Sequence, residues 1–191
     1  GVFNFEGGVK YAWMKEYYPA QNEEMKKYIG EGRWHITGSS WDATDALVPS
    51  TESFIRNIML GQQYYRQEFG VESTDIFLPD CFGFGWTLPT IASHCDLIGF
   101  SSQKLDWRVH PFYGKSKHPF TIGLWKGIDG SSIMLAHGYD YGKRWNDEDL
   151  SENEQLKELA GRTPLNAVYR YYGTGDIGGS PTLGSVRSVE K

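Results

Sequence analysis

The chain has 191 residues, of which 39% are hydrophobic and 15% aromatic, so it is long enough to bury a hydrophobic core. A formal net charge of -5 without a dense Lys/Arg cluster argues against nucleic acid or an anionic membrane as partner, because nothing would neutralise rows of phosphates. No apolar run approaches the roughly eighteen residues of a transmembrane helix, and the two cysteines predict neither a disulfide scaffold nor a Cys-rich metal site.

Helices and strands alternate along the first half of the chain, where apolar residues at helical spacing alternate with short apolar runs. Proline and glycine mark the ends, since proline is tolerated in a first helical turn and glycine stops a helix. In chain order the pattern predicts a helix from Pro19 to Gly30, a strand over 33–37, a helix over 49–68, a strand over 75–79, a helix from Pro89 and a strand over 97–101.

The second half of the chain begins with two predicted strands joined by a turn at Asp129-Gly130. Ser151 and Glu154 form a capping-box pattern for a helix that ends at Gly161. The remaining predictions are strands over 120–125, 132–136 and 167–172, a glycine-rich loop over 173–181, and a helix from Leu183.

This order of elements predicts one α/β domain, or a large part of one, over residues 1–191, built on a mostly parallel sheet or barrel. Active sites of such folds lie in the loops at the C-terminal ends of the strands. Polar residues follow five of the predicted strands, which predicts a site on one rim. They are Ser39, Trp41, Asp42, Asp45, Asp80, Gln103, Lys104, His137, Tyr139, Asp140 and Asp176.

Asp80 and Asp176 are candidates for a pair of catalytic carboxylates. Asp80 follows an apolar strand and is trailed by uncharged residues, and Asp176 lies among glycines that let the backbone approach a ligand closely. Glycoside hydrolysis needs one carboxylate as nucleophile and another as general acid and base. A helix N-cap for Asp80 and an Asx turn for Asp176 are the structural alternatives.

The glycine-rich loop also matches the G-x-G-x-x-G pattern of phosphate-binding loops, at Gly173, Gly175 and Gly178. The match is weak, because Asp176 would repel a phosphate and the βαβ unit of that motif is missing. A nucleotide-dependent enzyme is therefore the least supported function. The five histidines show none of the spacings of a zinc site, and only His137 is placed near the predicted rim.

Distinctive segments occur at several of these strand ends. They are Leu-Pro-Asp-Cys-Phe-Gly at 78–83, Ser-Ser-Gln-Lys-Leu at 101–105, Gly-Arg-Trp at 32–34 with Gly-Ser-Ser-Trp-Asp at 38–42, and the loop at 173–181. Together they resemble glycoside hydrolase family 38, the α-mannosidases, in its bacterial form; the first is similar to the family's Asp-x-Phe-Gly-His-Ser nucleophile motif. The resemblance covers nearly the whole chain. It implies part of the (β/α) seven-stranded barrel of the α-mannosidase catalytic domain.

The resemblance implies a retaining α-mannosidase that cleaves terminal α-linked mannose from a mannose-containing oligosaccharide or glycan. It makes Asp80 the nucleophile, which forms a covalent glycosyl-enzyme intermediate and also binds a catalytic zinc ion. Asp176 resembles the family's acid/base, so the two carboxyl groups are expected roughly 5 Å apart, as retention requires. The substrate-binding residues that it implies are Trp41, Asp42, Lys104, Tyr139 and Asp140.

The chain departs from the family pattern at Phe84, which stands where the motif has His and removes a polar group near Asp80. The family's other zinc ligands, a His-x-Asp pair upstream and a His downstream, are not in residues 1–191. We therefore expect the full-length enzyme to bind zinc and this chain alone to bind it weakly and to be inactive. A noncatalytic carbohydrate-binding or degenerate domain on the same fold is the alternative. Compartment and oligomeric state are not predicted.

Overall fold

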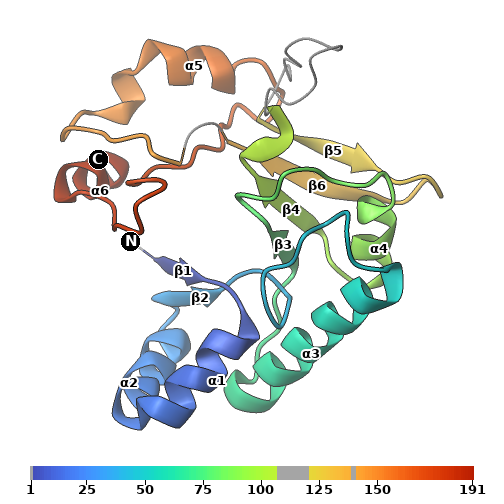
Figure 1. Ribbon diagram of the computed structural model, residues 1–191. Helices are drawn as coiled ribbons and strands as arrows, with labels where there is room; N and C mark the ends of the chain where they lie inside the picture. Colours follow the sequence, from blue (N-terminus) through green and yellow to red (C-terminus); the bar gives the residue numbers. More distant parts are fainter. Residues whose placement is uncertain (1, 107–120, 139–140) are drawn as a thin grey trace. The chain divides into compact units, whose positions relative to one another are not determined.

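The computed structural model describes residues 2–106, 121–138 and 141–191 (Figure 1). The chain divides into two compact units, the first formed by Gly1–Ser101 with Trp125–Met134 and the second by Ser102–Leu124 with Leu135–Lys191. A single domain can contain more than one compact unit, so the single domain expected over the whole chain stays a prediction. Among the described helices, none has both the length and the apolar composition needed to cross a membrane.

Short parallel strands alternate with helices in the part of the chain that precedes residue 103. The elements are β1 (Phe3–Phe5), α1 (Gly8–Tyr17), α2 (Pro19–Gly30), β2 (Trp34–Ile36), α3 (Thr51–Phe69), β3 (Asp75–Phe77), α4 (Leu88–His94) and β4 (Gly99–Ser102). β1 pairs with β2 in parallel, and β3 pairs in parallel with β4, with Ile76 opposite Phe100. These pairings confirm the expected α/β class.

The longest helix, α3, is capped at both ends. The Ser50 side chain accepts a hydrogen bond from the Ser53 backbone nitrogen at 3.2 Å. Gly70, with φ 67°, ends the helix and donates its N–H to the Arg66 carbonyl at 3.1 Å. The buried residues of α3 recur every three or four positions and so form one face: Phe54, Ile58, Gly61 and Tyr65.

Gly61 lets α3 lie directly against the chain that follows β2. A Cβ atom at this position would overlap the backbone carbonyl oxygen of Ser39, so only glycine fits. One turn later, the buried Tyr65 hydroxyl lies 3.1 and 3.2 Å from the carbonyl oxygens of Gly38 and Ser40 and donates to them. The helix thereby determines the path of the chain that leads from β2 to the predicted site residues.

The core beside β1 and β2 combines residues from β2 and from three helices: Tyr11, Met25, Ile36 and Tyr65. The Tyr11 hydroxyl donates to the Phe5 carbonyl at 2.9 Å and accepts a hydrogen bond from Trp34 Nε1 at 3.0 Å. Burial raises the pKa of Tyr11 well above its usual value. The buried phenol is therefore neutral and fully hydrogen-bonded.

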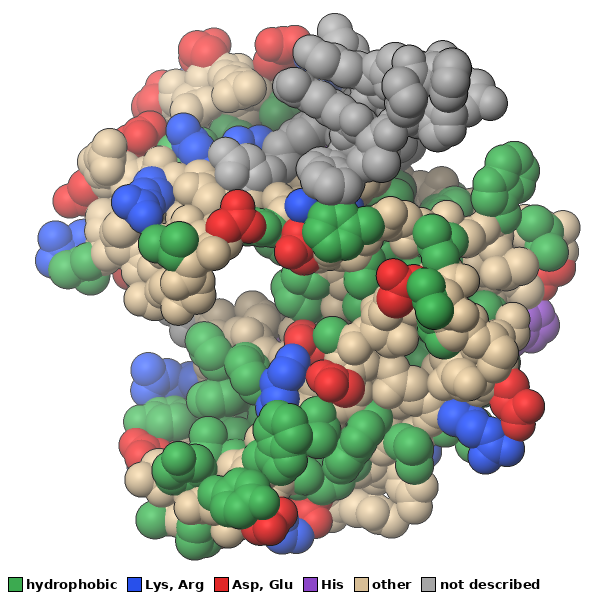
Figure 2. Space-filling model, in the orientation of Figure 1, with side chains coloured by type: hydrophobic (Ala, Val, Ile, Leu, Met, Phe, Trp, Pro, Cys, Tyr) green, Lys and Arg blue, Asp and Glu red, His purple; other side chains and the backbone are tan. Residues whose placement is uncertain are grey.

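Hydrophobic side chains also gather on the surface of the first unit, over α1 and α2 (Figure 2). Trp13, Tyr17 and Tyr18 are each more than half exposed. Apolar patches of this kind commonly contact other protein surfaces.

The predicted hairpin is present as β5 (Ile122–Lys126) and β6 (Ser132–His137). Each of these strands has residues in the first unit and residues in the second. The two strands complete a sheet with the strand order β3-β4-β6-β5. The elements of the second unit outside this sheet are the short helices η1 (Lys104–Asp106), η2 (Leu150–Glu152), α5 (Glu154–Ala160) and α6 (Leu183–Glu190). The helix predicted from Leu183 and the loop predicted over 173–181 are confirmed.

The hairpin turn is held by one carboxylate. Asp129 accepts hydrogen bonds from Ser131 Oγ at 2.6 Å, from the Ser131 backbone nitrogen at 3.1 Å and from Thr90 Oγ1 at 2.9 Å, and it pairs with His94 Nε2 at 2.9 Å. The bonds from Ser131, His94 and Thr90 hold the pKa of this carboxyl well below its usual range. Asp129 thus joins the turn to α4.

The strand predicted over 167–172 is wrong, because the structure has no strand there. Tyr169 donates its backbone N–H to the Thr121 hydroxyl at 3.0 Å, a side-chain acceptor in place of the main-chain acceptor of a neighbouring strand. Among the described residues the strands form a four-stranded and a two-stranded sheet. The structure therefore supports an α/β fold and does not confirm a seven-stranded barrel.

The start of α5 also differs from the prediction. Asn153 caps this helix, since its side-chain oxygen accepts a hydrogen bond from the Leu156 backbone nitrogen at 3.1 Å. Ser151 lies in η2 and donates to Asp149, so Ser151 and Glu154 do not form the capping box. The sequence interpretation also missed β1 and α1, whose apolar residues follow no clear period.

Candidate active site

Asp80 follows the C-terminal end of β3 after Leu78 and Pro79, in the loop where it was predicted. Leu78, the first residue after the strand, is buried and donates its N–H to the Ser101 carbonyl of β4 at 3.1 Å. The chain then turns at Pro79 and Asp80, and the Asp80 side chain is exposed. Ligands of parallel α/β sheets bind at this edge. Asp80 is not a helix N-cap, since the next helix, α4, is preceded by Thr87.

The chain around Asp80 is braced by the loop over residues 42–48. Cys81 Sγ donates to the Thr44 carbonyl at 3.0 Å, and Gly83, whose φ of 152° suits glycine, lies so close to Leu47 that a Cβ atom would overlap it. Burial raises the pKa of the Cys81 thiol, and the negative charges of Asp45 and Asp80 raise it further. The thiol that follows Asp80 in the chain is therefore neutral.

Asp45 has a structural role in the same loop. One oxygen of its carboxylate accepts the backbone N–H groups of Leu47 and Val48, at 2.7 and 2.8 Å. These two bonds hold the pKa of Asp45 below its usual value. The carboxylate shapes the loop against which the Asp80 turn is held.

Trp41 and Asp42 lie on the chain after β2, in the same unit as Asp80. The Trp41 backbone is bonded to Asn57 and Val9, at 2.8 Å each, and its ring packs edge-on against Tyr64 with the centroids 5.5 Å apart. Trp41 is half-buried, so much of its ring serves packing. Asp42 is exposed, with Lys10 Nζ 3.8 Å from its carboxylate, and can face a solvent-borne ligand.

Phe84 belongs to an aromatic cluster of the first unit. Its ring packs edge-on against Phe100 and Trp125, with centroid distances of 5.0 and 6.5 Å. Rings in this arrangement attract one another through their quadrupoles. Phe84, which stands where the family motif has His, therefore packs against one ring from β4 and one from β5.

A zinc ion does not fit the described residues by themselves. No group of three or more His, Cys, Asp or Glu side chains that would hold a metal occurs within residues 2–106, 121–138 and 141–191. Protein zinc sites take three or four such ligands. Asp80 therefore cannot form a zinc site with these residues alone.

Asp176 lies in the second unit, in the glycine-rich loop. Its carboxylate Oδ1 accepts a hydrogen bond from the Tyr141 hydroxyl at 2.5 Å. Asp176 itself has φ 43°, and the preceding Gly175 has φ 60°. Both residues thus adopt the left-handed backbone region that favours glycine. Because Asp80 and Asp176 belong to different units, the expected 5 Å between their carboxyl groups stays a prediction.

Lys104 lies in η1, where its backbone nitrogen donates to Ser102 Oγ at 3.1 Å. Lys104 Nζ stands 5.8 Å from the centroid of the Tyr141 ring. The neighbouring Gln103 accepts the Tyr141 backbone N–H at 3.0 Å. The second unit thus brings Lys104 and Asp176 to the same tyrosine, which the sequence interpretation missed although it follows directly after two predicted site residues.

The remaining predicted residues divide into two groups. Tyr139 and Asp140 lie outside the described residues. His137, at the end of β6, is 1% exposed and donates its backbone N–H to the Thr121 carbonyl at 2.8 Å. His137 is therefore a buried residue of the second unit.

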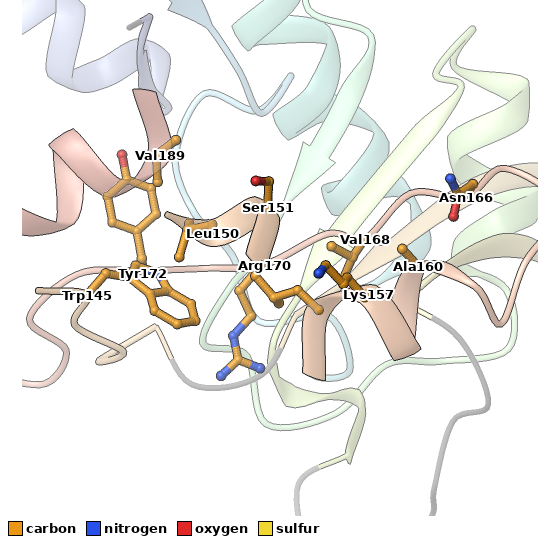
Figure 3. A pocket seen from close by; sticks show the side chains of 11 residues that line it. Trp145, Leu150, Ser151, Lys157, Ala160, Asn166, Val168, Arg170, Tyr172 and Val189 are labelled. Atoms are coloured by element: carbon orange, nitrogen blue, oxygen red, sulfur yellow. The ribbon is translucent and has the colours of Figure 1, made fainter. Parts of the chain in front are cut away.

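A separate cavity of about 650 Å³ opens in the second unit (Figure 3). Its walls are mostly apolar and include the basic side chains of Lys157 and Arg170. The lining residues are Trp145, Leu150, Ser151, Leu156, Lys157, Ala160, Asn166, Val168, Arg170, Tyr172 and Val189. Neither Asp176 nor Tyr141 lines this cavity.

Residues 5–190 match the model of the glycosyl hydrolases family 38 N-terminal domain. The chain belongs to glycosyl hydrolase family 38. It is 35% identical over 175 residues to alpha-mannosidase G of Dictyostelium discoideum and 31% identical over 172 residues to alpha-mannosidase 2C1 of Mus musculus. These alignments cover 91% and 89% of this chain but 16% of each relative, so the chain spans about one sixth of the length of these relatives.

Solved structures of low sequence identity share the fold. An alpha-mannosidase from Enterococcus faecalis V583 superposes with a TM-score of 0.62 at 17% identity, covering 91% of this chain and 20% of that chain. A 4-alpha-glucanotransferase from Thermococcus litoralis has a TM-score of 0.66 at 14% identity, covering 98% of this chain and 29% of that chain. The family model confirms the family resemblance deduced from the sequence, and these structures share its α/β fold.

Proposed function

We propose that the protein containing this chain is a retaining α-mannosidase that removes terminal α-linked mannose from oligosaccharides or glycans. The family supports a glycosidase, since the relatives are named alpha-mannosidases. The observation that carries the proposal is the position of Asp80, exposed in the turn directly after a parallel strand. The proposed fold of the whole catalytic domain is a (β/α) seven-stranded barrel to which both sheets belong.

Two carboxylates carry the proposed chemistry. Asp80 attacks the anomeric carbon and forms a covalent glycosyl-enzyme intermediate, while Asp176 protonates the departing oxygen. Asp176 then removes a proton from the water that releases mannose, which restores the original anomeric configuration. The support is that each carboxylate is exposed to solvent in a loop, with the neighbouring Cys81 thiol bonded beside Asp80 and the Tyr141 hydroxyl bonded to the Asp176 side chain.

The mannose-binding residues of the proposal differ in how well their environment suits the role. Asp42 is exposed, and Lys104 lies beside the ring of Tyr141, whose hydroxyl is hydrogen-bonded to Asp176. Both environments support a role in sugar binding. Trp41 offers a sugar only the exposed part of its ring. Tyr139 and Asp140 are retained as proposed pocket residues on the resemblance alone.

Zinc dependence is proposed for the full-length protein only. Asp80 would be one ligand, and the others would come from residues beyond those described here, which do not complete a site. The metal would orient and polarise the sugar when bound. Metal analysis of the full-length protein, with Asp80→Asn as the comparison, tests this: unchanged zinc content in that variant would remove Asp80 from the ligand set.

The decisive experiment replaces Asp80 by Asn in the full-length protein and measures hydrolysis of an aryl α-mannoside. Loss of a nucleophile is expected to lower kcat by roughly a thousandfold or more, with the melting temperature unchanged. NMR of the first product is expected to show the α-anomer of mannose, as retention requires.

Asp96→Asn is the matched control. Asp96 is also exposed, and it precedes β4, so it lies at the opposite ends of the parallel strands from Asp80. Its φ of 58° is a backbone conformation that Asn tolerates. This variant is expected to keep normal turnover. Full activity of Asp80→Asn would exclude Asp80 as nucleophile, and a full-length protein that binds mannosides without hydrolysing them would instead be a noncatalytic carbohydrate-binding domain.

A further inference from the structure

The proposed acid/base carboxylate is bonded to a residue that no motif of the sequence assigned. The Tyr141 hydroxyl donates to Asp176 Oδ1 at 2.5 Å, a length typical of a hydroxyl bonded to a carboxylate. We propose that Tyr141 is a positioning residue that orients Asp176 for proton transfer. The inference rests on the proposed acid/base role of Asp176.

Tyr141 is itself held by the segment that follows β4. Its backbone N–H donates to Gln103 Oε1 at 3.0 Å, and this bond holds the backbone of Tyr141 in place. Lys104 Nζ stands 5.8 Å from the centroid of its ring, within the range of a cation–π contact. The phenol is therefore presented to the glycine-rich loop by two consecutive residues of one short segment.

The glycine-rich loop lies directly on this tyrosine. A Cβ atom at Gly175 would stand 3.0 Å from ring carbons Cδ2 and Cε2 of Tyr141, closer than side chains normally approach. Gly173 donates its N–H to the Lys143 carbonyl at 2.8 Å, which ties the start of the loop to the same stretch of chain. Glycine at these positions permits the close approach that brings Asp176 to the hydroxyl.

The contact with Tyr141 limits how the carboxyl group of Asp176 can turn. The residue has φ 43°, in the left-handed region that Asp adopts more readily than most other residues. A carboxyl acid/base must aim one particular oxygen at the glycosidic oxygen. With Oδ1 engaged by Tyr141, Oδ2 is the oxygen that carries the transferred proton, and the hydrogen bond limits rotation of the carboxyl group.

This role predicts a defect that depends on the leaving group. Tyr141→Phe in the full-length protein keeps the ring against Gly175 and removes only the hydroxyl. With phenyl α-mannoside, whose leaving group needs a proton, kcat/KM is expected to fall about 10- to 100-fold, as for loss of a hydrogen bond to a charged group. With dinitrophenyl α-mannoside, whose leaving group departs without a proton, bond cleavage is expected to change less than about threefold.

Two further variants make the result unambiguous. Asp176→Ala is expected to lose more kcat/KM than Tyr141→Phe, again mainly with phenyl α-mannoside. Tyr172 lines the separate cavity (Figure 3), so Tyr172→Phe is expected to act like the wild type on both mannosides. Equal losses on both substrates, or none, in Tyr141→Phe would overturn the positioning role alone. Equal losses on both in Asp176→Ala would overturn the acid role of Asp176 in the proposed function, and the positioning role with it.

Discussion

The two compact units hold their functional carboxylates by different means. In the first unit, Asp80 follows a strand that is paired in parallel with β4, and capped helices bury a cluster around Tyr11 and Tyr65. In the second unit, Asp176 lies in a loop without regular structure and is held by a hydroxyl and by close glycine contacts. Regular secondary structure therefore determines the position of Asp80, whereas single side-chain contacts determine that of Asp176.

This difference has an energetic consequence. Apolar burial around a packed helix contributes several kcal/mol for each large side chain, while a buried hydrogen bond contributes about 1 kcal/mol net and costs about 1–3 kcal/mol when one partner is left alone. Substitutions in the core of the first unit are therefore expected to cost more stability than single polar substitutions in the second.

The largest effect on stability is expected for Tyr65→Ala in the first unit. Tyr65 has no exposed surface, so removal of its ring leaves a cavity and should lower the free energy of unfolding by about 3–5 kcal/mol. Urea denaturation measures the loss, and Tyr65→Phe is the control, with a smaller loss of about 1–3 kcal/mol from the missing hydroxyl. A loss below about 1 kcal/mol in Tyr65→Ala would contradict a core built on α3.

An intermediate effect is expected for Ser185→Ala in the second unit. The buried Ser185 hydroxyl accepts the Trp145 backbone N–H at 2.9 Å, so its removal leaves a buried donor unpaired and should cost about 1–3 kcal/mol. Ser188→Ala is the matched control: this buried hydroxyl on the same helix has no hydrogen-bond partner among the described residues, so its loss should be near neutral. Equal denaturation midpoints for both variants would contradict the structural role of Ser185.

The smallest effect is expected at Asp129 and depends on pH. Hydrogen bonds from Ser131, His94 and Thr90 depress the pKa of this carboxyl below its ordinary value of 3.8. The stability that it contributes is therefore complete above that value and is lost as pH falls below it towards the folded-state pKa. Asp129→Asn should lower the melting temperature slightly at neutral pH and make it less sensitive to acid below about pH 4. An unchanged acid sensitivity would show that the turn does not depend on the carboxylate.

Much of the first unit was predictable from local sequence. The helix ending at Gly70, the strand that precedes Asp80 and the hairpin turn at Asp129 all carry their signals within a few residues. The family resemblance, which depends on contiguous motifs, was equally accessible. Each of these features is local, so its sequence specifies it without knowledge of the rest of the fold.

The errors fall where distant residues decide. Residues 167–172 are apolar enough for a strand, yet they form none. The Tyr169 backbone N–H instead donates a hydrogen bond to the side chain of Thr121, 48 positions earlier. The burial of Trp41, which stays a predicted sugar-binding residue, is likewise decided by distant residues, since Tyr64 and Gly8 lie against its ring. No periodicity or motif reveals such neighbours.

The sequence by itself determined the α/β class, the glycosidase family and the position of Asp80, because capped helices, short strands and a contiguous motif encode them. Only the tertiary structure decided that Asp176 meets Tyr141, since the contact joins residues 35 positions apart. It also decided that Gly61 must be glycine, because the carbonyl that a Cβ atom would strike belongs to Ser39, which is far from it along the chain. Periodicity records which face of an element is buried, and the fold alone determines what that face meets.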